Sequence, residues 1–238
     1  MPDTLSAAHR TPHRLLGRTR EIARVLAGHG LESLVDQLGL RRFGPRFLHR
    51  RAESSQVSQA QRVRLALGEL GATFIKLGQM LSTHVDLLPP EFIAELSRLQ
   101  DHAPHVPFED VERILREDFA HLDPWPFAVL EREPLASASI GQVHAARLPG
   151  GDEVVVKVRR PGIVEQVERD IDILRGVVDW VQNHTPLGRD YDLRPVVDEF
   201  AHTIRDELDY VREAGNARRF ARLFESDAQV WIPRVYES

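Results

Sequence analysis

Only two of the 31 basic residues in this chain of 238 are lysines, Lys76 and Lys157. Lys76 lies in FIKLGQM, residues 74–80, and Lys157 lies in VVVKV, residues 154–158. Arginine is a wide planar fork, whereas lysine is a compact point charge on a thin stem, so a narrow site that grips one oxygen would accept only lysine. The other explanation is chance in an arginine-rich composition. The residues around each lysine distinguish the two explanations.

The segment before Lys157 has the pattern of a nucleotide-binding β-hairpin. ASASIGQV, residues 136–143, precedes Lys157 by fourteen residues and follows the spacing G-x-G-x-x-G-x-V, while VVVK occupies the place of V-A-I-K. Small side chains in such a turn let backbone N–H groups approach phosphate oxygens, and the lysine holds those oxygens. The alternative is an ordinary hairpin with a solvated lysine. The four pattern positions hold Ala136, Ala138, Gly141 and Val143.

Two glycines of that pattern are replaced by alanine, which changes what the turn can do. Alanine is small enough for close approach but resists positive φ, so we expect a stiffer loop than one built of glycine. Ser137 and Ser139 add hydroxyl groups that could bond phosphate or cap the turn.

The periodicity of apolar residues predicts an α+β protein. We expect helices over about 15–38, 63–81, 91–99 and 107–119, strands over about 127–132, 142–147 and 153–158, and a helix over 164–181. A further helix should begin at Pro195 and contain Phe200, Ile204, Leu208 and Val211, and QVWIPRVYES, 229–238, is predicted to be a last strand. Gly68, Gly71 and Gly78 inside the second helix suggest that another backbone or a ligand comes close.

Composition excludes several classes of protein. The chain has no cysteine, which rules out disulfides and cysteine-based zinc or redox sites. No apolar run approaches the about 18 residues of a membrane-spanning helix, and no signal-peptide pattern is present, so the expected location is cytoplasmic. Residues 1–51 carry ten arginines against four acidic residues. This basic segment could contact anionic lipid or nucleic acid, or it could be a solvated helical face.

Three longer stretches together resemble the UbiB family of atypical protein-kinase-like proteins, also called the aarF-domain or ADCK group. The resemblance runs from about residue 60 to residue 238 and includes a K-x-G-Q helix, an alanine-rich loop and an E-x-D helix. The stretches are FIKLGQMLSTHVDLLPPEFIAELSRLQDHAP, PLASASIGQVHAARLPGGDEVVVKVRRPGI and DELDYVREAGNARRF.

The resemblance implies a role for each matching residue. Lys157 corresponds to the phosphate-contacting lysine, Glu207 to the C-helix glutamate that pairs with it, and Asp209 completes E-x-D. The alternative for Asp209 is a local helix bond to Arg205 or Arg212. Ordinary kinase spacing would instead choose Glu165, Glu168 or Asp170 as the partner. The expected nucleotide-binding residues are Ala136, Ser137, Ala138, Ser139, Gly141, Val143 and Lys157.

The K-x-G-Q residues, Lys76, Gly78 and Gln79, are expected to have a regulatory role. In the family their helix lies where a kinase would receive a protein substrate, which favours ATPase or small-molecule activity. The ammonium groups of Lys76 and Lys157 are then expected to converge on one nucleotide cleft.

The implied architecture is a basic helical segment (1–55), a helical K-x-G-Q extension (56–125) and a kinase-like N-lobe (126–238) that has an antiparallel sheet, an αC-type helix and inserted helices. The catalytic-loop Asp and Asn and the D-F-G of a kinase do not occur in this sequence, so we expect a chain truncated before the C-lobe that is not a competent catalyst alone. The metal ligands are expected in that C-lobe, and none is predicted here.

The implied function is binding of ATP with Mg²⁺ in support of ubiquinone or related prenyl-quinone lipid biosynthesis. Expected partners are membrane lipid or prenyl-quinone intermediates and quinone-biosynthesis proteins, with peripheral membrane association and no nucleic acid. The alternative is a non-catalytic helical module that binds a membrane or a partner protein.

Overall fold

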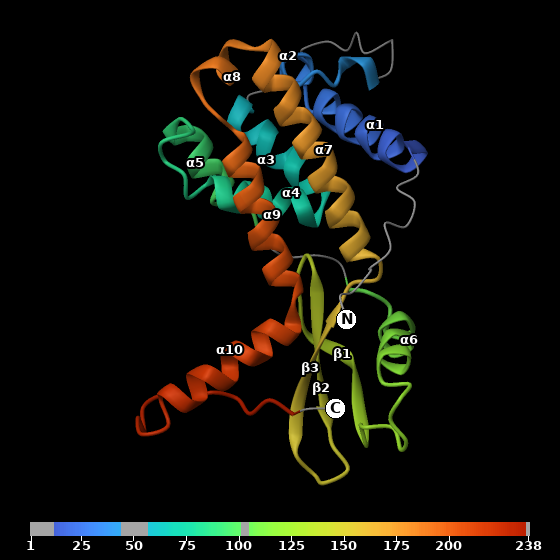
Figure 1. Cartoon of the computed structure of the whole chain (residues 1–238). Coiled ribbons are helices and arrows are strands. Elements are labelled where there is room, and N and C mark those ends of the chain that lie inside the picture. Colours follow the sequence, from blue (N-terminus) through green and yellow to red (C-terminus); the bar gives the residue numbers. More distant parts are fainter. Residues whose placement is uncertain (1–11, 44–56, 101–104, 237–238) are drawn as a thin grey trace, which may run out of the picture. The chain divides into compact units, whose positions relative to one another are not determined.

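A computed structural model describes residues 12–43, 57–100 and 105–236, and it divides the chain into two compact units (Figure 1). The first unit contains residues 1–100 and 165–201, and the second contains residues 101–164 and 202–238. The fold is α+β, because the first unit is helical and the second contains an antiparallel sheet.

The first unit is an assembly of helices around one main core. Its core residues come mainly from α1, α3, α4 and α7, and include Ile22, Leu26, Leu70, Phe74 and Ile173. A smaller cluster of Ile75, Leu96 and Leu99 joins α4 to the chain around α5. Its elements are α1 (Pro12–Gly28), α2 (Glu32–Gln37), the 3₁₀ turn η1 (Arg41–Phe43), α3 (Gln59–Leu70), α4 (Ala72–Leu81), α5 (Pro90–Leu96), most of α7 (Ile163–His184), α8 (Pro186–Asp190) and the first half of α9 (Arg194–Leu208).

Glycines with positive φ interrupt both helices that the sequence predicts near the amino-terminal end. The helix expected over 15–38 is wrong as one element, since Gly30 (φ 69°) separates α1 from α2. The helix expected over 63–81 is likewise two helices, α3 and α4, separated by Gly71 (φ 91°). Positive φ is readily adopted only by glycine. The apolar pattern continues across the Gly71 break because Leu70 and Phe74 enter the same core.

The expected close approach at a glycine is confirmed at Gly78. A Cβ atom there would lie 2.3 Å from Leu99 Cδ1 and 3.0 Å from Leu67 Cδ1, whereas a Cβ at Gly68 would meet no atom within 4 Å. The neighbours of Gly78 are leucine side chains rather than a ligand or a backbone. This glycine therefore lets α4 pack tightly against α3 and the residues after α5.

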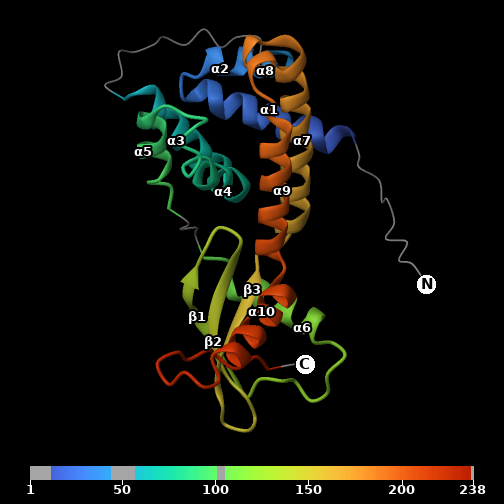
Figure 2. The ribbon, with the colours of Figure 1, turned by 60° about the vertical axis from the view of Figure 1, so that its left-hand side comes forward.

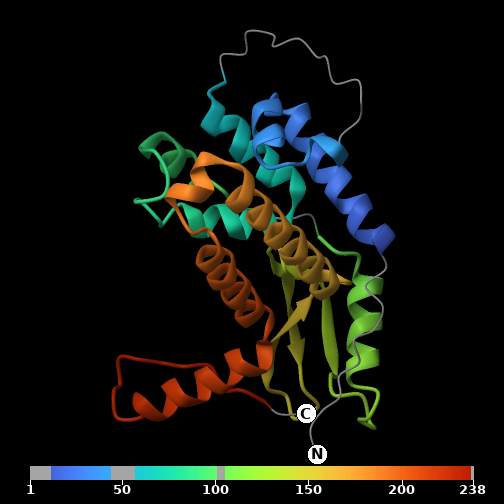
Figure 3. The same cartoon turned by 45° about the horizontal axis from the view of Figure 1, so that its top comes forward.

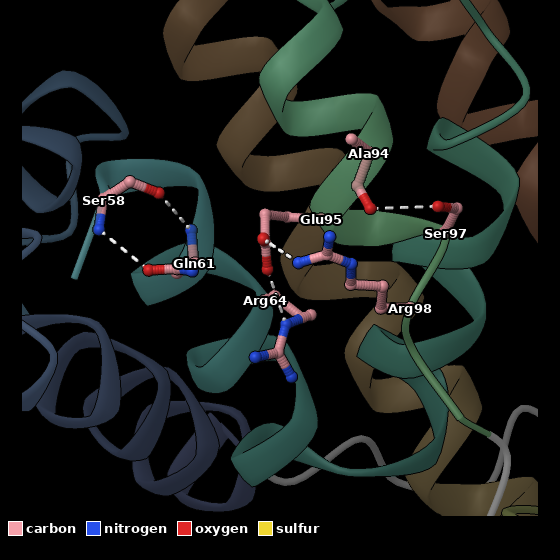
Figure 4. Close-up of polar contacts among 7 residues, drawn as sticks. All are labelled: Ser58, Gln61, Arg64, Ala94, Glu95, Ser97 and Arg98. Carbon is pink, nitrogen blue, oxygen red and sulfur yellow. Dashed lines mark hydrogen bonds and ion pairs between the residues drawn. The ribbon is translucent and has the colours of Figure 1, made fainter.

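Polar contacts fix the start of α3 and its pairing with α5 (Figure 4). Ser58 and Gln61 form a reciprocal capping box at the first turn of α3. The buried Glu95 of α5 accepts hydrogen bonds from Arg64 Nε (3.0 Å) and Arg98 Nη1 (2.5 Å). Two guanidinium groups thus balance one buried carboxylate between the helices.

A buried ion pair connects α1, α7 and the junction between α3 and α4. Arg18 Nε and Nη2 donate to the two carboxylate oxygens of Asp170 at 2.8 and 3.1 Å, and Nη2 also donates to the Leu70 carbonyl at 2.7 Å. Burial alone would lower the pKa of Arg18, but its bonds to Asp170 and Glu21 raise the pKa above the ordinary value. Arg18 therefore stays charged, and it satisfies a carbonyl at the end of α3, where intrahelical partners are missing.

Removing this carboxylate should destabilise the first unit strongly. Asp170→Asn leaves the guanidinium of Arg18, whose side chain is 12% exposed, without its buried charged partner and with only the half-exposed Glu21. We expect unfolding free energy to fall by about 3–5 kcal/mol, the usual cost of breaking a buried pair. Urea unfolding, monitored by the circular dichroism of the helices, measures this loss of unfolding free energy.

The matched control is Asp198→Asn, which removes an exposed partner of Arg175. Its cost should stay below about 1 kcal/mol because exposed ion pairs contribute little. Equal losses for the two variants would contradict the assigned role of Asp170.

The second unit is built on a three-stranded antiparallel sheet of order β1-β2-β3, seen in Figure 2 with the strands side by side. Val156 and Val158 of β3 pack against Val111 and Leu115 of α6. Its elements are α6 (Phe108–Asp118), β1 (Val129–Ser137), β2 (Gly141–Arg147), β3 (Glu153–Arg159), the end of α9 and α10 (Tyr210–Leu223).

Three predicted elements of this unit differ in the structure. The first strand continues past 132 to Ser137, with register shifts on both sides of Pro134, as an edge strand permits. The helix from Pro195 ends at Leu208, and Val211, predicted to belong to it, lies on α10 and is 83% exposed. The last strand is wrong over residues 229–236, which have no strand structure; Tyr236 instead bonds Asp152 Oδ2 through its hydroxyl. Residues 237–238 lie outside the described range.

In the described part of the chain, no helix has the length and apolar character needed to cross a bilayer.

Candidate nucleotide-binding site

The sheet places three residues of the hairpin pattern in one row. Ala136 of β1 pairs with Val143 of β2, and Val143 pairs with Lys157 of β3. The register therefore brings the two ends of the pattern, which are separated by twenty residues, to the same level of the sheet on β1 and β3, with β2 between them. This arrangement explains why the spacing between the loop and the lysine matters.

The row lies on the sheet face opposite to α6. Successive side chains of a strand point to opposite faces. Since Val156 and Val158 pack with α6, Val155 and Lys157 point to the other face. Figure 3 shows α10 on that other side of the sheet. The candidate site is therefore formed by β2, β3 and α10.

Two residues of α10 hold the Lys157 ammonium. Its Nζ donates to Glu213 Oε2 at 2.6 Å and lies 4.4 Å from the centre of the Tyr210 ring. An ammonium over an aromatic face is attracted by the ring quadrupole. The side chains of Lys157 and Glu213 are 40% and 56% exposed, so the pair is positioned but remains open to a ligand.

In the structure Lys157 pairs with Glu213, six residues beyond the predicted partner Glu207. The difference follows from the break between α9 and α10. Glu207 belongs to the last turn of α9, where it is half-buried, whereas α10 begins afresh at Tyr210. Residues three apart share a helix face, so this start aims Tyr210 and Glu213 together at β3.

Asp209 has a local role in the structure. Its carboxylate accepts a hydrogen bond from the Arg212 backbone N–H at 2.9 Å and caps the start of α10. A capping aspartate is a recognisable sequence signal for a helix start. A helix that begins after Asp209 places Tyr210 and Glu213 on one face. The capping aspartate is therefore the sequence signal that could have identified both residues.

The alanine-rich loop is closed by its own backbone and by Arg160, which the sequence interpretation did not single out. Ala138 N–H donates to the Gly141 carbonyl at 2.9 Å, and Arg160 Nε donates to the Ala138 carbonyl at 2.9 Å. Arg160 Nη2 also donates to Ser137 Oγ at 2.9 Å. The Ser137 hydroxyl is thus bound to the protein, and Ser139 is buried, so neither presents itself as an open phosphate ligand.

A buried polar chain supports the hairpin on the α6 side. The side-chain oxygen of Gln142 accepts from the Val106 N–H, and its Nε2 lies 3.1 Å from His144 Nε2. Since an amide nitrogen only donates, His144 Nε2 accepts and its Nδ1–H donates to the Glu131 carbonyl at 2.9 Å. Both side chains of this polar network, Gln142 and His144, have hydrogen-bond partners, which makes the hairpin a rigid base for the loop.

Gly141 permits α10 to approach the loop. A Cβ atom at this position would lie 2.4 Å from the Tyr210 hydroxyl oxygen and 2.8 Å from the Val158 carbonyl oxygen. The glycine of the pattern is thus required by packing within the protein, apart from any need of a phosphate.

The K-x-G-Q residues lie in the first unit, on α4. Gln79 Nε2 donates to the Leu99 carbonyl at 3.1 Å, Gly78 packs against Leu99, and Lys76 is half-buried. Lys157 belongs to the second unit. The convergence of Lys76 and Lys157 on one cleft stays a prediction.

A known protein-family model matches the part of the chain that contains the candidate site. The model of the ABC1 atypical kinase-like domain matches residues 98–238, which include the whole sheet and α10. This chain belongs to the ABC1 atypical kinase-like family. The ABC1 match covers the hairpin, Lys157 and Glu213.

Relatives extend the ABC1 similarity over most of the chain. The protein named "Probable protein kinase UbiB" of Pseudomonas paraeruginosa is 40% identical over 92% of this chain and 42% of its own length. An uncharacterized protein of Synechocystis, sll1770, is 42% identical over 75% of this chain and 30% of its own length. The chain therefore spans well under half of these relatives.

A solved structure supports the ABC1 kinase-like fold. It is the complex of Rv3197 with erythromycin from Mycobacterium tuberculosis, with 33% identity and a TM-score of 0.50 over 72% of this chain and 44% of that one. The predicted family and the α+β, N-lobe-like fold are confirmed.

A side chain at position 141 should destabilise the second unit. Gly141→Ala would force Tyr210 or the β3 backbone to move, and such overpacking costs about 1–3 kcal/mol. Thermal unfolding measures the loss. Gly150→Ala, in the open hairpin turn where a Cβ meets no atom within 4 Å, is the control and should change stability by less than about 0.5 kcal/mol. An unchanged melting temperature for Gly141→Ala would show that α10 does not approach the loop as described.

Proposed function

We propose that this chain binds ATP on the face formed by β2, β3 and α10, as part of an atypical kinase or ATPase that supports ubiquinone or related prenyl-quinone lipid biosynthesis. The observation that carries the proposal is the Lys157 ammonium, which Glu213 and Tyr210 hold in one row with Ala136 and Val143.

The ammonium has the chemistry required of a phosphate ligand. It carries three donors, and one of them is directed at Glu213. The remaining donors can contact phosphate oxygens without loss of the ion pair, which keeps the flexible stem in place. A guanidinium would present its donors as a wide fork instead.

The surroundings suit the base and the phosphates of a nucleotide. Val155 is exposed beside Lys157, and Ala145 lies opposite Val155 on β2. These side chains offer an apolar surface for a flat base. The Ala138 N–H is already bonded to the Gly141 carbonyl, so the backbone groups offered to the phosphates are the N–H groups of Ser139 and Gly141, as in turns of this type of hairpin.

The described residues offer groups that can bind a nucleotide, but they offer no set of ligands for Mg²⁺. No group of three or more His, Asp or Glu side chains among them is arranged to hold a metal ion. We therefore assign no step to Mg²⁺ in this chain, although phosphoryl transfer by kinases uses it. Binding of ATP is proposed for this chain, and turnover for proteins with the full length of the relatives.

The proposed place in quinone metabolism rests on the family alone. The chain belongs to the ABC1 family, several relatives at 40% identity are named UbiB, and the UbiB resemblance implies prenyl-quinone biosynthesis at membranes. Lipid intermediates and quinone-biosynthesis proteins are accordingly the proposed partners.

Lys157→Ala should weaken ATP binding by about 10-fold or more, because a hydrogen bond to a charged group contributes about 1.5–3 kcal/mol. Isothermal titration of the 238-residue chain with ATP measures the effect. The control is Arg147→Ala, which removes a cation at the far end of the same hairpin and should leave the affinity within about twofold.

Equal affinities for Lys157→Ala and the wild type would contradict the site. A wild-type chain that does not bind ATP would contradict the function and favour a partner-binding module. The exposed apolar residues Val211, Phe220 and Leu223 of α10 would then be its first candidate surface.

A further inference from the structure

Arg160 contacts three consecutive parts of the alanine-rich loop. Its backbone N–H donates to the Ile140 carbonyl at 3.0 Å, its Nε to the Ala138 carbonyl at 2.9 Å, and its Nη2 to Ser137 Oγ at 2.9 Å. Arg160 directly follows β3, whose last residues include Lys157. One residue therefore connects the strand of the lysine to the loop at three points.

These contacts determine where the loop directs its N–H groups. A peptide unit is planar and trans, so its carbonyl and the following N–H point in opposite directions. The carbonyls of Ala138 and Ile140 both point to Arg160. The N–H groups of Ser139 and Gly141 therefore both point away from it.

Ser137 fixes the loop from the other side. Its Oγ accepts the bond from Arg160 and lies 3.4 Å from Gln142 Oε1, to which it can donate its proton. Gln142 is buried and tied to Val106 and His144. The start of the loop thus lies between the guanidinium and a rigid buried network.

We infer that Arg160 is a positioning residue for the phosphates of the nucleotide. This inference rests on the proposed ATP binding and adds to it the group that orients the loop. Arg160 directs Nε and Nη2 at the loop, so it acts through the N–H groups of Ser139 and Gly141. It does so where alanines have replaced the glycines of the usual pattern.

The fork of the guanidinium is required for this role. Nε and Nη2 reach two acceptors at once, and the planar group keeps them in fixed relation. A lysine retains the charge but reaches one acceptor at a time. Charge and geometry can therefore be separated by substitution.

The test is ATP binding by the 238-residue chain with Arg160→Ala, Arg160→Lys and Ser137→Ala. We expect about tenfold weaker binding for Arg160→Ala, corresponding to loss of one well-placed contact. Arg160→Lys and Ser137→Ala should fall between this variant and the wild type. Arg147→Ala, the distant cation, is the control and should bind like the wild type.

A second readout separates positioning from general damage to the fold. In ¹⁵N-labelled wild type, ATP should shift the amide resonances of Ser139 and Gly141, and in Arg160→Lys those shifts should shrink while the rest of the spectrum is retained. If Arg160→Ala does not fold, Arg160→Lys and Ser137→Ala decide the matter.

The outcomes for the two proposals are distinct. Wild-type affinity and wild-type amide shifts in both Arg160→Lys and Ser137→Ala would overturn the role of Arg160. If Lys157→Ala still weakens binding in that case, the proposed function stands. A wild-type chain that shows neither ATP binding nor amide shifts overturns both.

Discussion

The contact between Lys157 and Glu213 is the interaction on which the candidate site depends. It is an exposed ion pair, and such pairs contribute only about 0–1 kcal/mol to stability. Its importance is therefore geometric, because it joins the end of β3 to the first turn of α10. The position of Glu213 depends on where α10 begins. Asp209 sets this start, because its carboxylate accepts a hydrogen bond from the Arg212 N–H and caps the helix. Tyr210, in that same first turn, fits only because residue 141 has no side chain.

The first unit depends on a different kind of interaction. Arg18 and Asp170 form a pair in which the carboxylate is fully buried, and the same guanidinium satisfies the carbonyl of Leu70 before the break at Gly71. This break separates α4, the helix of the K-x-G-Q residues, from α3. Two of those residues, Gly78 and Gln79, are used to pack α4 against Leu99. The first unit is thus held by buried side chains. The candidate site is held by directional contacts between exposed side chains.

The sequence predicts the elements whose signals are local. The valines of VVVKV and the Pro149-Gly150-Gly151 turn before them identify the β2–β3 hairpin, and the regular apolar spacing identifies α7. Periodicity fails at Gly30 and Gly71, because a helix can turn at a glycine while its apolar residues stay in one core. It fails again at 229–236, where a segment of β-like composition pairs with neither edge of the three-stranded sheet.

Residue types and spacing identify Lys157 and the loop, but they do not identify what holds them. Glu207 and Glu213 are both acidic residues close to E-x-D, and the choice between them depends on a helix break of a single residue. Arg160 is one of many arginines, and its role is visible only from three distances to the loop. The partners of a site depend on tertiary geometry, which a motif does not encode.

The most direct measurement is a double-mutant cycle on Lys157 and Glu213, with ATP affinity as the readout. If Glu213 acts by holding the ammonium, Glu213→Ala weakens binding in the wild-type background and causes no weakening when Lys157 is already alanine, so the two effects are strongly non-additive. If Glu213→Ala changes ATP affinity by the same factor in both backgrounds, the pair does not position the lysine for the nucleotide and the account is wrong.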